Sequence, residues 1–170
     1  NDSMVEGSET ITVGMSNSSS SSVAVTDTAT VTITDDEASP TVTLSASTTS
    51  PAENAGTVTL TATQSLAASS ATTVSLLPSG TATNGSDYSL SSSTITIAAG
   101  STSGTATLTI TDDSIVESSE TIIVNISGVS GGNSASENGN QQVTITVSDN
   151  EASPTAVSYT HLRAHETVDY

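Results

Sequence analysis

Four carboxylates fall within nine residues in DDSIVESSE (112–120), between the alternating runs TATLTIT (105–111) and TIIVNIS (121–127). Alternation of apolar and small polar residues is typical of β-strands with one buried face. The acidic stretch is therefore predicted to be a loop between two strands. Like charges about 4 Å apart repel by roughly 1 kcal/mol in water, so clustered carboxylates stay solvated, take up protons or bind a metal ion.

The rest of the chain offers these acids no cationic partner. Residues 1–155 contain sixteen Asp and Glu and not one Lys or Arg. Ion pairs therefore cannot neutralise the cluster, and a hard divalent cation with oxygen ligands fits it best. The same charge balance argues against nucleic acid and anionic membranes as partners, because both call for Lys and Arg. No apolar stretch approaches the ~18 to 20 residues that span a membrane.

Size and composition favour one thin aliphatic core. The chain has 170 residues, 33% of them hydrophobic, with no Phe, Trp or Cys. One domain of ordinary size and a fragment fit this length. The absence of Cys excludes disulfides and Cys-based zinc sites.

An internal repeat organises the chain. Residues 1–16 match residues 112–127 in pattern, and residues 33–41 return as 147–155, which gives a repeat length of 114 from Pro40 to Pro154. We therefore expect residues 1–39 to be the last two strands of one unit and residues 40–155 to be a whole unit. The sequence reads as a fragment of a longer protein. An isolated hairpin is marginal in water, so the partial unit is expected to be frayed or wrongly packed.

The last residues, 156–170, break the pattern. They hold the only Arg and both His, and no strand like the one at 42–47 follows Thr155. We predict a non-native or disordered tail and leave it out of the fold. His161 and His165 could hold zinc if helical, but two His without a third ligand are weak evidence.

Seven strands are predicted in the whole unit, at 41–47, 57–63, 72–78, 88–97, 104–111, 120–127 and 141–148. Seven short antiparallel strands without helical periodicity indicate an all-β fold, an immunoglobulin-like antiparallel β-sandwich. The side chains expected to point inward are aliphatic and alternate along the strands: Val58, Leu60, Ile95, Ile97, Leu108, Ile110, Ile122, Val124, Ile126, Val143, Ile145 and Val147. Tyr88 is expected to be a packed core or corner residue.

Strand direction predicts where the acids meet. If successive strands alternate in direction, eight of the nine acids in residues 40–155 fall at one end of the sandwich, and only Glu137 falls at the other. Solubility alone would scatter them. The acids at the shared end come from four separate connections: Glu53, Asp87, Asp112, Asp113, Glu117, Glu120, Asp149 and Glu151.

Three motifs in order resemble the Calx-β repeat. They are GTATNGSDY (80–88), DDSIVESSE (112–120) and DNE (149–151). That family includes regulatory calcium-binding domains of sodium-calcium exchangers and tandem units of large bacterial surface proteins. The resemblance covers residues 40–151 and the partial unit at 1–39, and implies an immunoglobulin-like sandwich with Ca²⁺ at one end.

The resemblance also implies a ligand set. The expected ligands in the whole unit are the eight acids above, the backbone carbonyl of Ile115, and Asn150. The corresponding positions of the partial unit are Asp2, Glu6, Glu9, Asp35, Asp36 and Glu37. Asn150 stands where the family has a carboxylate, which predicts that one calcium position is weaker or absent.

Catalysis is not expected, because both His lie outside the repeat and no Ser-His-Asp arrangement is credible. Paired acids could cleave glycosides, but there are too many acids and too few aromatic residues. The function expected is a calcium-binding structural spacer in a large secreted or cell-surface bacterial protein, with neighbouring repeats as partners and an extracellular ligand as a further candidate. The alternatives are a ligand-binding adhesion module and a calcium-sensing regulatory domain of a transporter.

Overall fold

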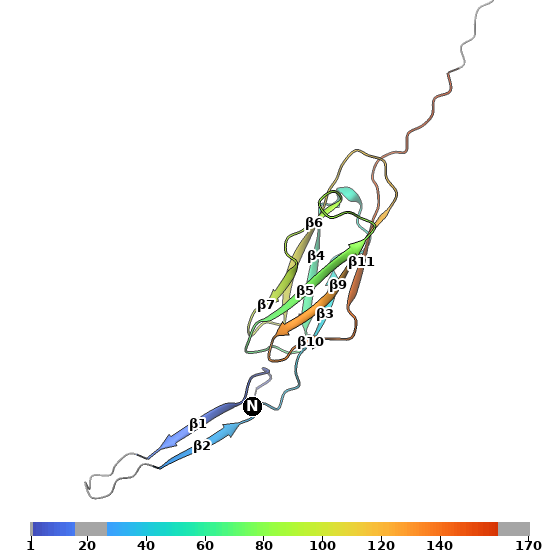
Figure 1. Cartoon of the computed structure of the whole chain (residues 1–170). Coiled ribbons are helices and arrows are strands. Elements are labelled where there is room, and N and C mark those ends of the chain that lie inside the picture. The colour runs from blue at the N-terminus through green and yellow to red at the C-terminus, as the bar shows by residue number, and fades with distance from the viewer. Residues whose placement is uncertain (1, 16–26, 160–170) are drawn as a thin grey trace, which may run out of the picture.

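The computed structural model describes residues 2–15 and 27–159. Residues 40–151 form a β-sandwich, and a two-stranded hairpin from the start of the chain extends from one end of it (Figure 1). The predicted tail lies mostly outside the described residues, since only 156–159 are described, without regular structure. Within the described part of the chain, no helix has the length and apolar character needed to cross a membrane.

Two sheets make up the sandwich, with the strand orders β10-β3-β4-β8-β6 and β11-β9-β5-β7. The strands of the first sheet are β3 (Thr41–Ala46), β4 (Thr57–Gln64), β6 (Tyr88–Leu90), β8 (Ser103–Ile110) and β10 (Ser136–Glu137). Those of the second are β5 (Thr72–Gly80), β7 (Thr94–Ile97), β9 (Glu120–Gly131) and β11 (Gln142–Val147). The predicted all-β, immunoglobulin-like sandwich is therefore confirmed.

One predicted strand is divided in the structure. Residues 88–97 form β6 at the edge of the first sheet and β7 at the edge of the second. Ser91 donates its N–H to the Thr107 carbonyl in the first sheet, and the Ser93 carbonyl accepts from Leu76 in the second. The chain thus crosses between the sheets at 91–93. The prediction of a single strand over residues 88–97 was therefore wrong.

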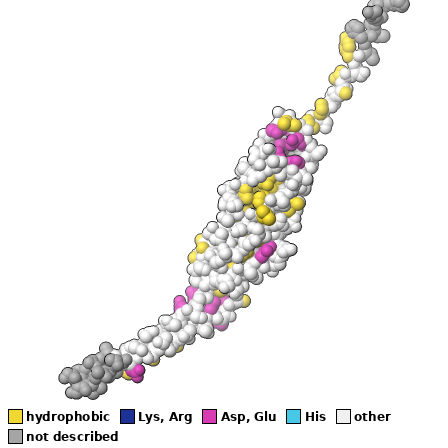
Figure 2. Space-filling model, in the orientation of Figure 1, with side chains coloured by type: hydrophobic (Ala, Val, Ile, Leu, Met, Phe, Trp, Pro, Cys, Tyr) yellow, Lys and Arg dark blue, Asp and Glu magenta, His cyan; other side chains and the backbone are white. Residues whose placement is uncertain are grey.

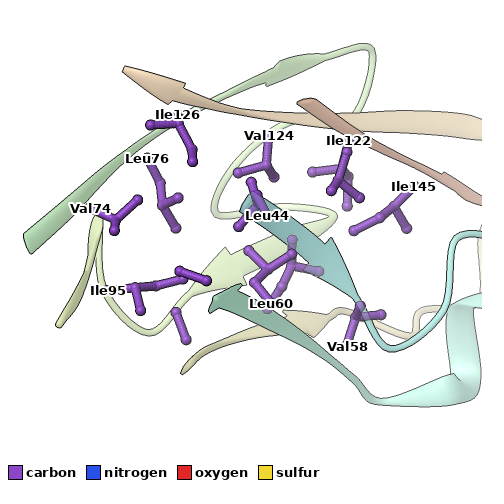
Figure 3. Packing of buried hydrophobic residues seen from close by; sticks show 14 of the residues in the cluster. Leu44, Val58, Leu60, Val74, Leu76, Ile95, Ile122, Val124, Ile126 and Ile145 are labelled. Carbon is purple, nitrogen blue, oxygen red and sulfur yellow. The ribbon is translucent and has the colours of Figure 1, made fainter. Parts of the chain in front are cut away.

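The core consists of aliphatic side chains from the two facing sheets. Side chains of β9, such as Ile122 and Val124, point toward Leu60 and Val58 of β4 (Figure 3). Eleven of the twelve predicted inward positions are buried, while Val147 is partly buried against the core. Tyr88 is also buried, as predicted. Period-2 alternation was a sufficient guide because each sheet has one face in the core.

Parallel backbone pairing joins the start of the sandwich to its exit. The Thr146 and Ser148 N–H groups donate to the carbonyls of Thr49 and Pro51, and Glu53 donates back to the Ser148 carbonyl. A parallel bridge links Ala52 to Ser148. These bonds hold the short 3-10 helix η1 (Glu53–Ala55) against the end of β11, which places Glu53 beside the acids that follow the last strand.

The hairpin consists of β1 (Glu9–Gly14) and β2 (Thr28–Ile33), paired antiparallel over their whole length. The fraying or wrong packing expected of the partial unit is not seen in these strands. Every residue of both strands is nevertheless exposed, because no second sheet of the described residues covers either face.

Candidate calcium centre

Acidic side chains gather at the far end of the sandwich and again where the hairpin meets it (Figure 2). The first group, called here the sandwich cluster, is brought together by η1, by the loop between β5 and β6, by the loop between β8 and β9, and by the exit of β11. Its members are Glu53, Asp87, Asp112, Asp113, Glu117, Glu120, Asp149 and Glu151. The four connections converge because alternating antiparallel strands return to the same end.

Within the sandwich cluster, six carboxylates form two sets of three. Oxygens of Glu53, Asp149 and Glu151 lie within 4.8 Å of one another. The same limit holds for a second set, which consists of Asp87, Glu117 and Glu120. Sequence reasoning foresaw one converging group but not this division.

A small cavity of about 20 Å³ is lined by members of both sets. Its walls include Glu53, Asp87, Glu117, Glu120 and Asp149. A space of this size holds about one water-sized sphere, and oxygen atoms from carboxylates are the ligands that Ca²⁺ prefers.

The two remaining acids, Asp112 and Asp113, belong to neither set among the described residues. Their charges still reach Glu53, whose pKa is raised first by burial and then by Asp113, Asp149, Glu117 and Asp112. They therefore add to the negative potential of the cluster, but they lie outside the two sets of closely spaced carboxylates.

Burial and mutual repulsion raise the pKa of Glu53 and of Glu120 and so favour their neutral forms. The pKa of Glu120 is raised by its burial and by the charge of Asp87. Glu53 is only 7% exposed. Ionised acids in such a place need a counter-charge, yet the described residues 2–15 and 27–159 contain no Lys, Arg or His.

Two acids of the sandwich cluster, Asp149 and Glu151, follow β11 directly, and one oxygen of this pair has no hydrogen-bond partner. Asp149 accepts the Glu151 N–H at 3.3 Å, and Asn150 donates its side-chain amide to Glu151 at 3.1 Å. The contact with Asp149, together with burial, raises the pKa of Glu151 to about 7. The buried Oε2 of Glu151 has no hydrogen-bond partner. Two carboxylates in this arrangement need either a shared proton or a cation between them.

The predicted ligands Ile115 and Asn150 both lie at this end of the sandwich. Ile115 is in the loop between β8 and β9, where its N–H donates to Asp113 Oδ1 at 2.7 Å. Their roles as ligands stay predictions. The acid predicted to stand apart, Glu137, does so, since it lies in β10 and pairs with Val42 of β3.

The second group of acids, called here the hairpin cluster, surrounds an open hollow of about 220 Å³. It contains all six positions predicted in the partial unit: Asp2, Glu6, Glu9, Asp35, Asp36 and Glu37. The structure thus brings them together at a hairpin that no described residues complete into a sandwich. The hollow is about ten times larger than the cavity of the sandwich cluster, because the described residues place no counterpart of η1 or of the β5–β6 loop over it.

The same hydrogen bond tethers the acidic loop to the strand exit in both clusters. In the sandwich cluster, Glu117 donates its N–H to Asp149 Oδ2 at 3.1 Å. In the hairpin cluster, Glu6 donates to Asp35 Oδ2 at 2.9 Å. The internal repeat therefore extends to individual contacts.

A second tether also recurs. The N–H of Met4 donates to Asp2 Oδ1 at 2.9 Å, as Ile115 does to Asp113. The pKa of Glu37 is raised, chiefly by its contact with Asp35, which parallels the Glu151 pair. The two acidic loops are thus held by the same pair of hydrogen bonds.

These features define a class: an immunoglobulin-like sandwich whose loops at one end gather carboxylates without counter-charges. The family model for the Calx-beta domain matches residues 1–37 and 35–151. The chain therefore belongs to the Calx-beta domain family, and the resemblance seen in the sequence is confirmed. A search of curated proteins found no match.

Solved structures of the family share the fold. The crystal structure of the apo-form Calx CBD1 domain matches with a TM-score of 0.53 and 16% identity, covering 65% of this chain and 98% of that one. The crystal structure of CBD12 from CALX1.2 matches with a TM-score of 0.51 and 16% identity, covering 59% of this chain and 41% of that one. At this identity the likeness shows the fold alone.

Proposed function

We propose that this chain is part of a tandem array of calcium-binding spacer domains in a large secreted or cell-surface protein. The observation that carries this proposal is the recurrence of the acidic cluster. Two clusters with the same loop tethers lie one after the other along the chain, one at the end of the sandwich where β11 exits and one at the joint with the hairpin (Figure 2). A spacer needs such regularly placed, stiffened joints.

The role of calcium in this proposal is electrostatic. Ca²⁺ would be held by the two sets of carboxylates, where it would offset their repulsion. It would also give a partner to Glu151 Oε2, which belongs to the first set but does not line the small cavity. The residues fit the ion because all offer oxygen ligands. Bound ions would fix η1 and the loops after β5 and β8 against the exit of β11. Neighbouring repeats are the partners that this function requires, and an extracellular ligand is a further candidate.

Thermal unfolding of the chain with calcium and with a chelator tests the proposal. Calcium at about 100 times its dissociation constant adds about 2.7 kcal/mol per independent site, so the midpoint should rise clearly. Glu137→Gln is the matched control, because it removes one charge far from the cluster and should leave the calcium-induced rise intact. An unchanged midpoint on adding calcium would rule out a calcium-dependent spacer.

A regulatory calcium sensor is the second candidate. The hairpin cluster lies next to the joint, since Val5, between the acids Asp2 and Glu6, contacts the sandwich. An ion bound there could therefore alter the angle between units. Solution scattering separates the two functions: a spacer changes in stiffness with calcium at a constant mean shape, whereas a sensor switches between two mean shapes.

A further inference from the structure

At the joint between the hairpin and the sandwich, an apolar residue of the acidic loop, Val5, packs against the sandwich. This contact is not part of the candidate calcium centre. Val5 donates its N–H to the Ala67 carbonyl at 2.9 Å, and its own carbonyl accepts the Ser69 N–H at 2.9 Å. The two bonds form a parallel bridge between Val5 and Ala68. Val5 is 3% exposed and Ala68 is fully buried, so the sandwich covers the valine almost completely.

The receiving loop, residues 67–70, is held by its own sandwich. Gly100 donates its N–H to the Ala68 carbonyl at 2.8 Å. Asn133 Oδ1 accepts from the Ser70 N–H at 3.1 Å and from the Ser70 hydroxyl at 2.8 Å. These bonds come from two neighbouring loops of the same repeat. These bonds hold the loop, called here the socket, from within its own sandwich, in addition to the two bonds that Val5 makes with it.

Met4 completes the contact. A Cβ atom placed on Gly100 would lie 4.0 Å from Met4 Cε, so the methionine side chain reaches over this glycine. Two successive apolar residues in the middle of an acidic loop thus dock on the socket end of the following sandwich.

The repeat provides the same apolar pair at the other end of the sandwich. Ile115 and Val116 occupy the positions of Met4 and Val5 in the matching stretches 112–127 and 1–16. Both loops carry the two recurring tethers described above. Yet Ile115 is 61% exposed and Val116 is 42% exposed. The pair thus has the same loop tethers as Met4 and Val5, but no part of the described chain covers it as the 67–70 loop covers Val5.

The connection that follows the cluster recurs too. Pro40 is fully buried at the start of the sandwich, and its carbonyl accepts the Ser136 N–H at 3.0 Å. Its counterpart one repeat later, Pro154, is exposed. At the end of the whole repeat, the apolar pair and the proline that are buried or half-buried at the first joint have exposed counterparts.

We infer that Ile115 and Val116 form a docking surface for the 67–70 loop of another repeat of this kind, attached through Pro154. The occupant follows from the contact that Val5 already makes in this chain. The inference rests on the proposed tandem array but not on calcium, because the Val5 contact consists of backbone bonds and apolar burial.

The test uses an extended protein in which a second copy of residues 40–155 is joined after Ser153, so that Pro40 of the copy replaces Pro154. Since the chain has no cysteine, Val116→Cys introduces a single thiol whose rate of alkylation reports its exposure. Leu77→Cys is the matched control, because Leu77 is 58% exposed on β5, away from the joint. Ile115→Cys provides a second probe of the same surface.

The Val116→Cys thiol should react at least about tenfold more slowly in the extended protein than in the present chain, as expected when a valine-sized group becomes buried. The Leu77→Cys thiol should react at the same rate in both. Equal rates in both proteins for Val116→Cys and Ile115→Cys would overturn the inference. Each measurement is made with calcium and with chelator: protection in either condition supports docking, whereas the calcium function is judged separately from the thermal midpoint.

Discussion

The hairpin β1–β2 and the strand pair β9–β11 are the same structure in two surroundings. Glu9 pairs with Ile33 and Gly14 with Thr28, while at the matching positions Glu120 pairs with Val147 and Asn125 with Gln142. The register is identical.

Burial separates the two pairs. Ile11 is 51% exposed and Val13 57% exposed, whereas their counterparts Ile122 and Val124 are fully buried. Strand pairing is therefore determined by the local sequence, and burial by the opposite sheet. The comparison distinguishes what a strand pair can do alone from what the sandwich adds to it.

Truncation of a matched isoleucine should give the largest difference between the two regions. Ile122→Ala is expected to destabilise the sandwich by about 2–5 kcal/mol, because it leaves a cavity in the core. Ile11→Ala should change the stability of the sandwich by less than about 0.5 kcal/mol, as for other exposed positions. Urea unfolding of both variants measures this, and similar losses would mean that the hairpin face is covered in solution.

Removal of a matched acid should give the next largest difference. Glu117→Gln is expected to abolish most of the calcium-induced stabilisation, about 2.7 kcal/mol at 100 times the dissociation constant. Glu6→Gln should leave it nearly unchanged, because the open hairpin cluster has no folded core to stabilise. Calcium titrations followed by thermal unfolding measure both. Equal losses would place the stabilising ion at the joint instead.

Replacement of the docked valine should affect the joint alone. Val5→Ser is expected to weaken docking by about 1.5 kcal/mol, the low end of the range for burying a valine side chain. The Ser69 amide, which donates to Val5, should then exchange with solvent about tenfold faster. Val13→Ser, at an exposed position of β1, is the control. No change at Ser69 would show that the joint is not populated in solution.

The smallest expected effect is a pH dependence that separates the two acid pairs. Glu151 has a folded pKa of about 7 against an ordinary value of 4.5, so the folded state holds more protons between these values. Without calcium, its contribution to stability is fully present below pH 4.5 and is lost as the pH rises toward and through 7. The thermal midpoint in chelator should therefore fall between pH 5 and 8.

Calcium supplies the counter-charge in place of the proton, so the fall in midpoint should shrink when calcium is present. Glu151→Gln should reduce it, and Glu37→Gln, in the equivalent pair of the hairpin cluster, should not. A midpoint that rises with pH in chelator would contradict the assigned direction of the Glu151 pKa.

Much of the fold could be predicted because its signal is local. Alternation identified the buried aliphatic positions from Val58 to Ile145, since a strand with one face in the core imposes a period of two. The division of 88–97 was missed because the crossing residues, Ser91 to Ser93, are as compatible with a strand as with a corner. Their partners on both sheets decide which they become.

For the candidate site, the sequence predicted which end of the sandwich the acids share, but not how they are grouped there. Strand direction collects the acids there, but the two sets of three depend on loop conformations that no spacing encodes. The docking contact was missed altogether, although it had a signal. An apolar pair recurs inside both acidic loops, as Met4 with Val5 and as Ile115 with Val116, where a purely metal-binding loop would need only its carboxylates and backbone.

The parallel bonds between residues 49–53 and 146–148 have a mechanical consequence. The chain enters the whole repeat at one end of the sandwich and leaves it at the other, after Ser148. A pull between Pro40 and Pro154 therefore drives these two segments past each other along their length. Because the bonds of Thr146, Ser148 and Glu53 lie across that direction, they are loaded together in shear and cannot open one after another as in unzipping. We therefore expect the resistance of the sandwich to tension to be concentrated beside its acidic end.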